Sequence, residues 1–290
     1  MQKFLAAGPA DSDATISPVP IKTSQKHRAN AVSTRPRKRF GQHFLHDPGT
    51  IARIVESIAP APGQRLLEIG PGRGAITAPL LKACGSLDVI EIDAGVIPTL
   101  RRACDGLGEL RIHEADALEF DLREFRGDGQ KLRLVGNLPY NISTPLLFHF
   151  LNQLDAIEDM HFMLQKEVVT RMAAKPGNKD YGRLTVMLAP WVRVEPLFDI
   201  GTGAFKPPPR VVSTFFALQP HDEPPFQLRN RAGYARVVAA AFSQRRKTLR
   251  NSLASLLDSA AIEAAGADPS IRPERLPPET FARLADQLAQ

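Results

Sequence analysis

Apolar residues recur along this chain with two alternating periods, one typical of helices and the other typical of strands. A first helix is predicted from the apolar positions Ile51, Ile54, Val55 and Ile58. Apolar runs of strand length follow at 66–69, 88–93, 109–113 and 132–135, and helical segments such as 75–83 separate them. This alternation, which continues to Leu151, predicts an α/β fold with a mostly parallel, doubly wound sheet.

The second half of the chain continues this sheet and then becomes helical. Residues 160–164 predict a fifth strand, in preference to a core helix, and 192–198 and 211–218 predict two last strands joined by a short loop, with the last strand antiparallel. A proline-rich linker follows at 220–225. Beyond it, helical patterns at 234–242, 248–257 and 278–288 predict a small, all-helical C-terminal domain. We therefore expect a flexible tail (1–34), a large domain (35–220) and a helical domain (221–290).

Positive charge is distributed unevenly along the 290 residues. The formal charge is +6, with 37 Lys and Arg against 31 Asp and Glu. No acid lies between Asp13 and Asp47, whereas this stretch contains Lys22, Lys26, Arg28, Arg35, Arg37, Lys38 and Arg39. Such a run is typical either of an arm that binds nucleic acid or of a solvated tail, and both interpretations stay open for residues 1–34.

Composition argues against several classes of protein. Cys84 and Cys104 lack the spacing of metal ligands, so we expect no disulfide framework, no metal and a reduced, cytoplasmic setting. No apolar run reaches the roughly 18 residues that cross a bilayer. The apolar part of the start is too short for a secretory signal, and Asp11 and Asp13 argue against an organellar transit peptide.

A glycine-rich turn follows the strand at 66–69. Gly70, Gly72 and Gly74 are spaced as G-x-G-x-G, which differs from the G-x-G-x-x-G of dinucleotide sites. Glu68 and Pro71 place a carboxylate and a rigid turn where a pyrophosphate site would present a helix N-terminus. These features favour a cationic, phosphate-free ligand such as S-adenosylmethionine over a simple tight turn.

Acidic and amide side chains follow the next three strands. Glu91 ends the strand at 88–93 and is the candidate acceptor for the two ribose hydroxyls of a cofactor. Asp116 follows the strand at 109–113 and is the candidate acceptor for the adenine amine. Asn137 follows the strand at 132–135. Because the carboxyl ends of parallel strands meet at one edge, we expect these side chains and the glycine turn to gather there.

The loop Asn137-Leu138-Pro139-Tyr140 has the groups needed to hold an exocyclic amine. The side-chain oxygen of Asn137 accepts hydrogen bonds. Pro139 pushes Leu138 out of the helical region, which leaves the Leu138 carbonyl as a second acceptor. Tyr140 adds a flat face on which a base can stack. The alternative interpretation is a strand-to-helix turn with a buried tyrosine, and the neighbouring motifs favour the functional one.

Together these motifs resemble the ribosomal RNA adenine N6-dimethyltransferase family. The resemblance rests on residues 40–45 (FGQHFL), 68–74 (EIGPGRG), 137–143 (NLPYNIS) and 205–211 (FKPPPRV), and residues 241–253 resemble the small-subunit enzyme. It covers the chain from about Arg37 to near the C-terminus and implies a Rossmann-like class I methyltransferase fold. The cofactor residues that it implies are His43, Leu45, Gly70, Glu91, Asp116 and Asn137; His43 stands where many members have Asn.

The resemblance also implies a substrate. The implied substrate is a pair of adjacent adenosines in the 3′-terminal hairpin loop of 16S ribosomal RNA, within an immature small subunit. The enzyme is expected to act as a monomer. Asn137 and the Leu138 carbonyl would hold the adenine amine, with the base between Tyr140 and Phe205, because the prolines at 207–209 predict an exposed loop. Phosphate contacts are expected from Arg245, Arg246, Lys247 and Arg250, since no acid interrupts 229–257.

Two alternatives share these motifs. The large-subunit adenine N6-methyltransferases that confer antibiotic resistance have the motifs of the first domain, and residues 245–253 argue against them. A small-subunit assembly factor that binds precursor RNA, with catalysis secondary, would need the same basic surface. Sequence leaves this second alternative open.

Overall fold

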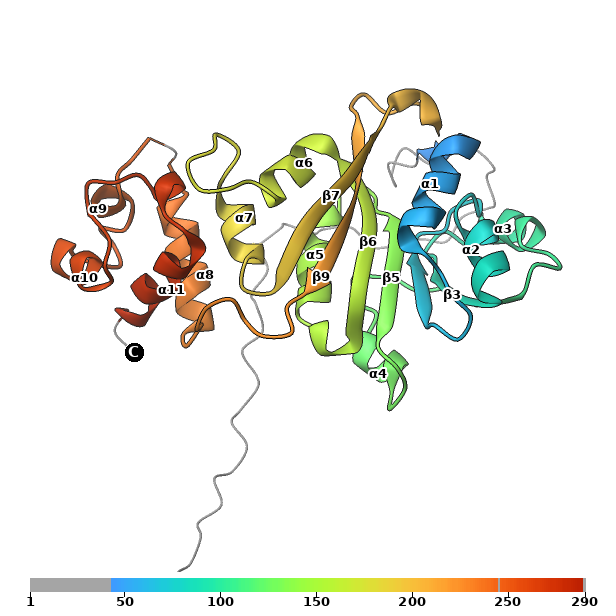
Figure 1. Cartoon of the computed structure of the whole chain (residues 1–290), viewed down its shortest axis with the longest axis horizontal. Coiled ribbons are helices and arrows are strands. Elements are labelled where there is room, and N and C mark those ends of the chain that lie inside the picture. The colour runs from blue at the N-terminus through green and yellow to red at the C-terminus, as the bar shows by residue number, and fades with distance from the viewer. Residues whose placement is uncertain (1–42, 245, 289–290) are drawn as a thin grey trace, which may run out of the picture.

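The computed structural model describes residues 43–244 and 246–288, so the tail predicted at 1–34 lies outside the described residues. Within this range the strands form a seven-stranded sheet and a two-stranded sheet. The strands are β1 (Phe44–Leu45), β2 (Leu66–Ile69), β3 (Ser86–Ile90), β4 (Glu109–His113), β5 (Leu132–Asn137), β6 (Ile157–Gln165), β7 (Val192–Ile200), β8 (Phe205–Lys206) and β9 (Ser213–Pro220). Figure 1 shows the large sheet at the centre of the molecule.

The large sheet has the order β4-β3-β2-β5-β6-β9-β7. Strands β4, β3, β2, β5 and β6 pair in parallel, and β9 is antiparallel to both of its neighbours, β6 and β7. The direction in which successive strands are added reverses at β2, because β3 and β4 lie on one side of β2 and β5 lies on its other side. The predicted fold class, a mostly parallel methyltransferase-like sheet with an antiparallel last strand, is confirmed.

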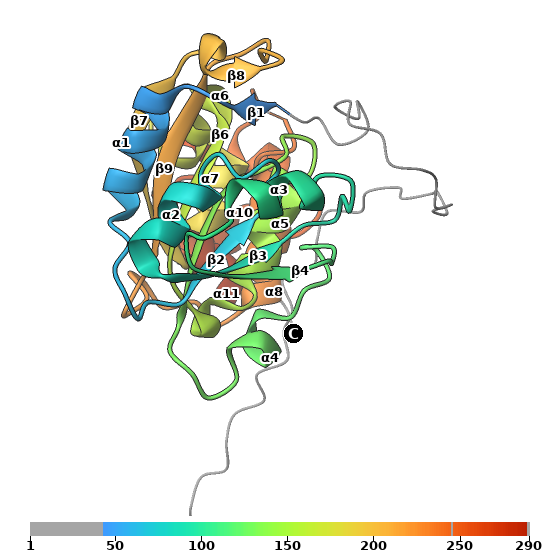
Figure 2. The same ribbon diagram turned by 90° about the vertical axis from the view of Figure 1, so that its right-hand side faces the viewer.

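Helices cover both faces of this sheet (Figures 1 and 2). They are α1 (Pro48–Ile58), α2 (Thr77–Cys84), α3 (Ile97–Ala103), α4 (Leu122–Arg126), α5 (Ser143–Leu151), α6 (Lys166–Met172) and α7 (Arg183–Leu188). Buried side chains of α1, α2 and α3 share one core with Leu66 and Val135, whereas those of α4, α5 and α6 share another with Leu67 and Leu134. Neighbouring residues of one strand thus face different cores, as the period of two requires.

The start of α1 shows how local sequence sets a boundary. Asp47 precedes the helix, and its carboxylate accepts a hydrogen bond from the Thr50 backbone nitrogen at 2.7 Å, which satisfies one of the free donors of the first turn. Pro48 occupies the first helical position, where no donor is needed. Ile54 and Ile58 are fully buried, as the helical spacing predicted.

The C-terminal region is helical, as predicted, and contains α8 (Arg231–Ala241), α9 (Leu249–Ser252), α10 (Ser259–Ala264) and α11 (Pro278–Asp286). Figure 1 shows these helices to one side of the sheet, next to α7. Tyr234 donates a hydrogen bond to the Val186 carbonyl of α7 at 2.7 Å, and Tyr181 donates to the Leu276 carbonyl at 2.8 Å. The C-terminal core therefore continues into α7, and a domain boundary at residue 220 stays a prediction.

Three local predictions were wrong. The loop between β7 and β9 contains a further strand, β8, which pairs with β1, and neither short strand was predicted. β9 begins at Ser213, so Val211 and Val212 precede it. The helix predicted over 248–257 ends at Ser252, and the carboxylate of Asp258 caps α10 by accepting from the Ala261 nitrogen. The buried leucines 249, 253 and 257 gave helical spacing to a segment that turns after one helical turn.

Candidate functional site

Four parallel strands bring the predicted cofactor residues to one edge of the sheet. The Gly70 nitrogen donates to the Ile90 carbonyl at 2.9 Å, and the Glu91 nitrogen donates to the His113 carbonyl at 3.0 Å. The residue after β2 is therefore joined to the end of β3, and the residue after β3 to the end of β4. Asp116 lies beyond the same end of β4, and Asn137 is the last residue of β5. Open α/β sheets bind ligands at this edge, beside the strand where the order reverses.

Glu91 shapes the glycine turn from the neighbouring strand. Its carboxylate accepts from the Gly72 nitrogen at 3.2 Å and from the Asp93 nitrogen at 2.8 Å. Gly72 has a φ of 55°, and a Cβ there would lie 3.2 Å from the Phe44 ring, so the position requires glycine. Glu91 is 6% exposed, and burial raises its pKa. A carboxylate offers about four acceptor positions, so it has capacity left for ligand hydroxyls.

Glu68 places a second buried carboxyl beside the turn. It is 2% exposed, and burial raises its pKa to about 7. Among the described residues its Oε2 atom and the Thr77 hydroxyl form no hydrogen bond of full geometry, although Thr77 is close enough to lower the pKa of Glu68 against the effect of burial. Unpaired buried acceptors favour a cation and disfavour a phosphate. The donor set therefore fits a positively charged ligand such as S-adenosylmethionine, as the glycine spacing predicted.

Glu68→Gln should change how the stability of the protein depends on pH. Below the ordinary pKa of 4.5, both folded and unfolded chains hold this proton. Between 4.5 and about 7 the unfolded chain loses it first, so the free energy of unfolding falls as pH rises. Glu68→Gln should abolish this fall in the free energy of unfolding. The variant should therefore be more stable than wild type at pH 8 by up to about 3 kcal/mol, with a smaller difference at pH 5.

Urea unfolding of both proteins at the two pH values measures this effect. Glu56→Gln, at an exposed position of α1, is the matched control and should leave the pH dependence unchanged. If the free energies of unfolding of Glu68→Gln and wild type differed by the same amount at pH 5 and at pH 8, Glu68 would be ionised at both pH values and the prediction would be wrong.

Asp116 lies in a turn after β4. Its Oδ1 atom accepts from the Leu118 nitrogen at 2.9 Å, which fixes the carboxylate. The residue is partly buried, so a side of it faces solvent at the same edge as Glu91. Its position is compatible with the role of adenine acceptor, which stays a prediction.

Asn137 ends β5, and its amide has a defined orientation. The side-chain nitrogen donates to the His43 carbonyl at 3.2 Å. Because a carbonyl only accepts, the amide must point its nitrogen at His43, which leaves its oxygen as an acceptor for another group. The Leu138 side chain is buried, and its carbonyl has no hydrogen bond to a described residue. The two acceptors that sequence predicted are thus available.

Tyr140 is held at both ends. Its hydroxyl lies 2.6 Å from the Ser213 hydroxyl, and its backbone carbonyl accepts from the Ser143 hydroxyl at 3.2 Å. Its ring centroid lies 6.0 Å from that of His43, with 31° between the ring planes. The His43 Nδ1 atom donates to the Pro207 carbonyl at 2.8 Å. The ring is half-buried, and burial raises the pKa of its hydroxyl.

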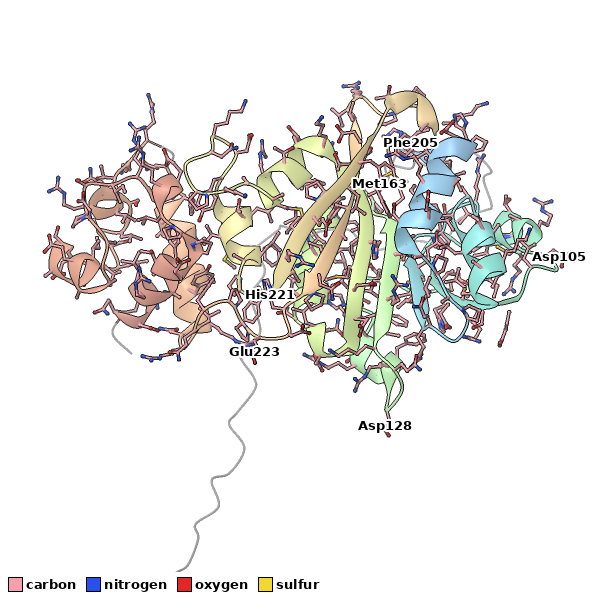
Figure 3. The ribbon with its side chains drawn as sticks, in the orientation of Figure 1. Asp105, Asp128, Met163, Phe205, His221 and Glu223 are labelled. Carbon is pink, nitrogen blue, oxygen red and sulfur yellow. The ribbon has the colours of Figure 1, made fainter. Side chains whose placement is uncertain are left out.

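Phe205 does not lie on an exposed loop, so that expectation was wrong. The residue is 2% exposed and packs in the same core as Leu45, its partner in the β1–β8 pair. Figure 3 shows it at the same end of the sheet as Met163, which belongs to that core. The prolines stiffen the loop after β8, but pairing with β1 turns the phenylalanine inward. In this structure Phe205 offers no free face to a base.

Sequence reasoning missed Ser213 and the backbone carbonyls of His43 and Pro207. Ser213 is fully buried at the start of β9, 73 positions from Tyr140. A small polar residue at the start of a mostly apolar strand, close after the recognised 205–211 motif, was the available signal. The two carbonyls had no signal in the sequence, because any residue type carries one.

The basic cluster of the helical region lies between α8 and α9. Arg246, Lys247 and Arg250 are exposed, and Arg245 lies outside the described residues. The Arg250 nitrogen donates to the Pro269 carbonyl at 3.0 Å, which fixes the start of α9 against a neighbouring loop. The structure does not bring this cluster beside Tyr140, because it belongs to the helices at the other side of α7 (Figure 1).

Residues 43–244 and 246–288 contain neither a metal-binding cluster nor a membrane-spanning helix. No group of three or more His, Cys, Asp or Glu side chains is arranged to hold a metal ion. No helix in this part of the chain combines the length and apolar character needed to cross a membrane.

Known proteins resemble this chain over most of its length. A model of the family described as ribosomal RNA adenine dimethylase matches residues 33–290. Ribosomal RNA small subunit methyltransferase A of Pseudomonas putida is 54% identical over 255 residues, which cover 88% of this chain and 96% of that protein. The protein of the same name from Pseudomonas aeruginosa is 55% identical over 256 residues, again with 88% and 96% covered.

Solved structures agree with the fold. The 23S rRNA methyltransferase ErmE superposes with a TM-score of 0.66 at 27% identity, over 85% of this chain and 100% of that chain. A dimethyladenosine transferase from Plasmodium falciparum superposes with a TM-score of 0.71 at 24% identity, over 83% of this chain and 96% of that chain. Together with the family match and the identities above 50%, these findings show that the chain belongs to the ribosomal RNA adenine dimethylase family.

Proposed function

We propose that this chain transfers methyl groups from S-adenosylmethionine to the N6 amines of two adjacent adenosines. The adenosines lie in the 3′-terminal hairpin loop of 16S ribosomal RNA, within an immature small subunit, and each receives two methyls. Relatives above 50% identity are named small-subunit methyltransferases, and their similarity extends over 88% of the chain. The 23S rRNA enzyme is 27% identical, so the large-subunit alternative is not favoured.

The orientation of the Asn137 amide carries this proposal. Its nitrogen is engaged by the His43 carbonyl, so its oxygen is left to accept a hydrogen bond from an exocyclic amine. The Leu138 carbonyl is the second acceptor. Two acceptors on a two-hydrogen amine fix the direction of its lone pair, and a positioned nucleophile gains most of its rate from this alignment.

Each cofactor residue contacts a different part of S-adenosylmethionine. Glu91 takes the ribose hydroxyls, Asp116 takes the adenine amine, and Gly70 with the turn at 70–74 lets the backbone approach closely. Leu45 and His43 enclose the site from the chain before α1. S-adenosylmethionine supplies an activated methyl on a sulfonium, so the nitrogen forms its bond to carbon as the carbon–sulfur bond breaks.

The protein's own contribution is position and the exclusion of water. An adenine inside a duplex is out of reach, so the target base must be unpaired or extruded. Tyr140 provides its stacking face, held by Ser213 and flanked by His43. After each transfer the amine releases a proton to solvent. The monomethylated amine retains one hydrogen for one acceptor, which allows the second transfer to use the same site.

The setting of this activity follows from the same interpretation. We place the protein in the cytoplasm as a monomer, with residues 35–220 as the methyltransferase domain and 221–290 as a helical RNA-binding domain. The basic tail at 1–34 is a candidate RNA contact. Arg245, Arg246, Lys247 and Arg250 contact phosphates away from the target base.

Replacing Arg246, Lys247 and Arg250 with Gln should weaken binding to the immature subunit and flatten its dependence on salt. Each lost phosphate contact reduces the log–log salt slope by about 0.7 to 0.9, because fewer counterions are released. Cofactor affinity should stay unchanged. Binding titrations over a series of salt concentrations measure the slope.

The control removes the same charge elsewhere. Lys82, Arg102 and Lys131 are exposed on the methyltransferase domain, and their triple Gln variant should keep most of the slope. Equal slopes for the two triple variants would mean that net charge, and not the cluster, binds RNA.

One experiment tests the function itself. The protein is incubated with methyl-labelled S-adenosylmethionine and with immature small subunits, large subunits or naked ribosomal RNA, and the modified nucleotides are mapped. We expect two adjacent dimethyladenosines near the 3′ end of 16S RNA, with immature small subunits as the best substrate. Methylation confined to large-subunit RNA would contradict the proposal.

A further inference from the structure

The loop between β8 and β9 is fastened to the proposed target site at both ends. At its start, the Pro207 carbonyl accepts from His43, whose ring lies beside Tyr140. At its end, the Ser213 hydroxyl bonds the Tyr140 hydroxyl at 2.6 Å. Figure 2 shows β8 beside β1 at one end of the molecule, beyond the strand ends. Both ends of this loop therefore lie close to Tyr140.

The loop exposes two adjacent apolar side chains. Val211 and Val212 are each 38% exposed, and among the described residues the other large apolar side chains exposed to this degree are Ile92 and Leu197. The Val212 carbonyl accepts from the Lys166 nitrogen at 2.9 Å, so the backbone there is fixed. Three prolines restrict the preceding residues. The two residues, here called the valine pair, are exposed apolar side chains on a restricted backbone, and each gains free energy when it is covered.

Positive charge precedes the valine pair along the chain. Lys206 and Arg210 are exposed on the same loop, and within the described part of the chain neither forms an ion pair. Asp199, at the end of the neighbouring strand β7, is paired with Lys166 and accepts from the Thr214 hydroxyl. Exposed apolar side chains on the same stretch as two unpaired cations suit a base face and its neighbouring phosphates.

We propose that the valine pair binds the nucleobase adjacent to the adenosine that stacks on Tyr140. This inference rests on the proposed function, in which the substrate is two neighbouring adenosines. While one base is held by Asn137 and Tyr140, the other remains one nucleotide away, outside the pocket and unstacked. Contact with Val211 and Val212 covers its apolar face, and Arg210 and Lys206 contact the linking phosphates. The same surface then holds the first, dimethylated base while the second enters.

The test combines a protein change with an RNA change. The variant Val211→Ser/Val212→Ser is compared with wild type on small-subunit particles assembled with a synthetic 3′-terminal hairpin. The hairpin carries either both adenosines or an abasic site in place of one of them. The readouts are KM for the particle, kcat and the dissociation constant for S-adenosylmethionine. We expect the variant to raise KM about tenfold on the intact hairpin, from the loss of apolar contact, with kcat and cofactor affinity unchanged.

The abasic hairpin separates this role from general damage. For wild type, KM should rise about tenfold when the neighbouring base is absent. For the variant, KM should be nearly the same on the two hairpins, because the contact with that base is already gone. Val211→Ile/Val212→Ile keeps the apolar surface and should behave as wild type. Leu197→Ser, an equally exposed apolar residue on β7, is the control and should leave KM unchanged on both hairpins.

The outcomes distinguish this inference from the function on which it rests. If wild type fails to methylate the intact hairpin in any particle, the proposed function is wrong. Suppose instead that wild type methylates the intact hairpin. If the Ser variant then has the same KM as wild type, or if KM rises by the same factor for both proteins on the abasic hairpin, the valine pair does not bind the neighbouring base. The proposed function is unaffected by either result.

Discussion

Asn137→Ala should slow methyl transfer by about 100-fold or more at saturating S-adenosylmethionine, while the fold and RNA binding persist. The side-chain oxygen is one of the two acceptors that align the amine, and loss of a single positioned group at a reacting centre has effects of this size. The variant also frees the His43 carbonyl, so His43 and the ring contact with Tyr140 loosen together. Single-turnover rates on immature subunits measure the effect.

Asn178→Ala is the matched control for this experiment. Asn178 is exposed in the loop between α6 and α7, where its side chain accepts from the Asp180 nitrogen. Its removal should leave the single-turnover rate within about twofold of wild type. A rate for Asn137→Ala close to that of the control, at saturating cofactor, would remove the mechanism proposed for the amine.

Glu91→Ala should weaken S-adenosylmethionine binding by roughly 10- to 150-fold, the equivalent of about 1.5 to 3 kcal/mol for a hydrogen bond to a charged group. The structure adds a second cause to the loss of the ribose acceptor. The same carboxylate holds the Gly72 and Asp93 nitrogens, so the variant also releases the glycine turn. Glu91→Gln keeps an acceptor for one of these nitrogens and should lose less. Calorimetry on the folded variants gives the dissociation constants.

Glu114→Ala tests whether the effect is specific. Glu114 is an exposed acid beyond the end of β4, at the same edge of the sheet, and its replacement should leave the affinity within about twofold. Equal affinities of Glu91→Ala and Glu114→Ala would remove Glu91 from the cofactor site. Since burial raises the pKa of Glu91, cofactor binding by wild type should also weaken as pH falls through that raised pKa. Glu91→Gln should lack this dependence.

The order of strands and helices could be predicted because each is encoded by neighbouring residues. The helical spacing of 51–58 and the apolar runs before Gly70, Glu91 and Asn137 all gave elements that the structure contains. Prediction failed where the period was ambiguous or the element short. The leucines at 249, 253 and 257 fit a helix, yet the capping of α10 by Asp258 begins a new one. Two-residue strands such as β1 have no period to detect.

The sequence by itself determined which residues follow the strand ends. In a parallel sheet that fact already places the glycine turn, Glu91, Asp116 and Asn137 at one edge. Only the tertiary structure decided how the side chains there are oriented and held. The amide of Asn137 is turned by a backbone carbonyl 94 positions away, Tyr140 is held by Ser213 across 73 positions, and Phe205 is buried by its pairing with Leu45. Local propensity carries no information about such contacts, because they form only when the packed core brings distant segments together.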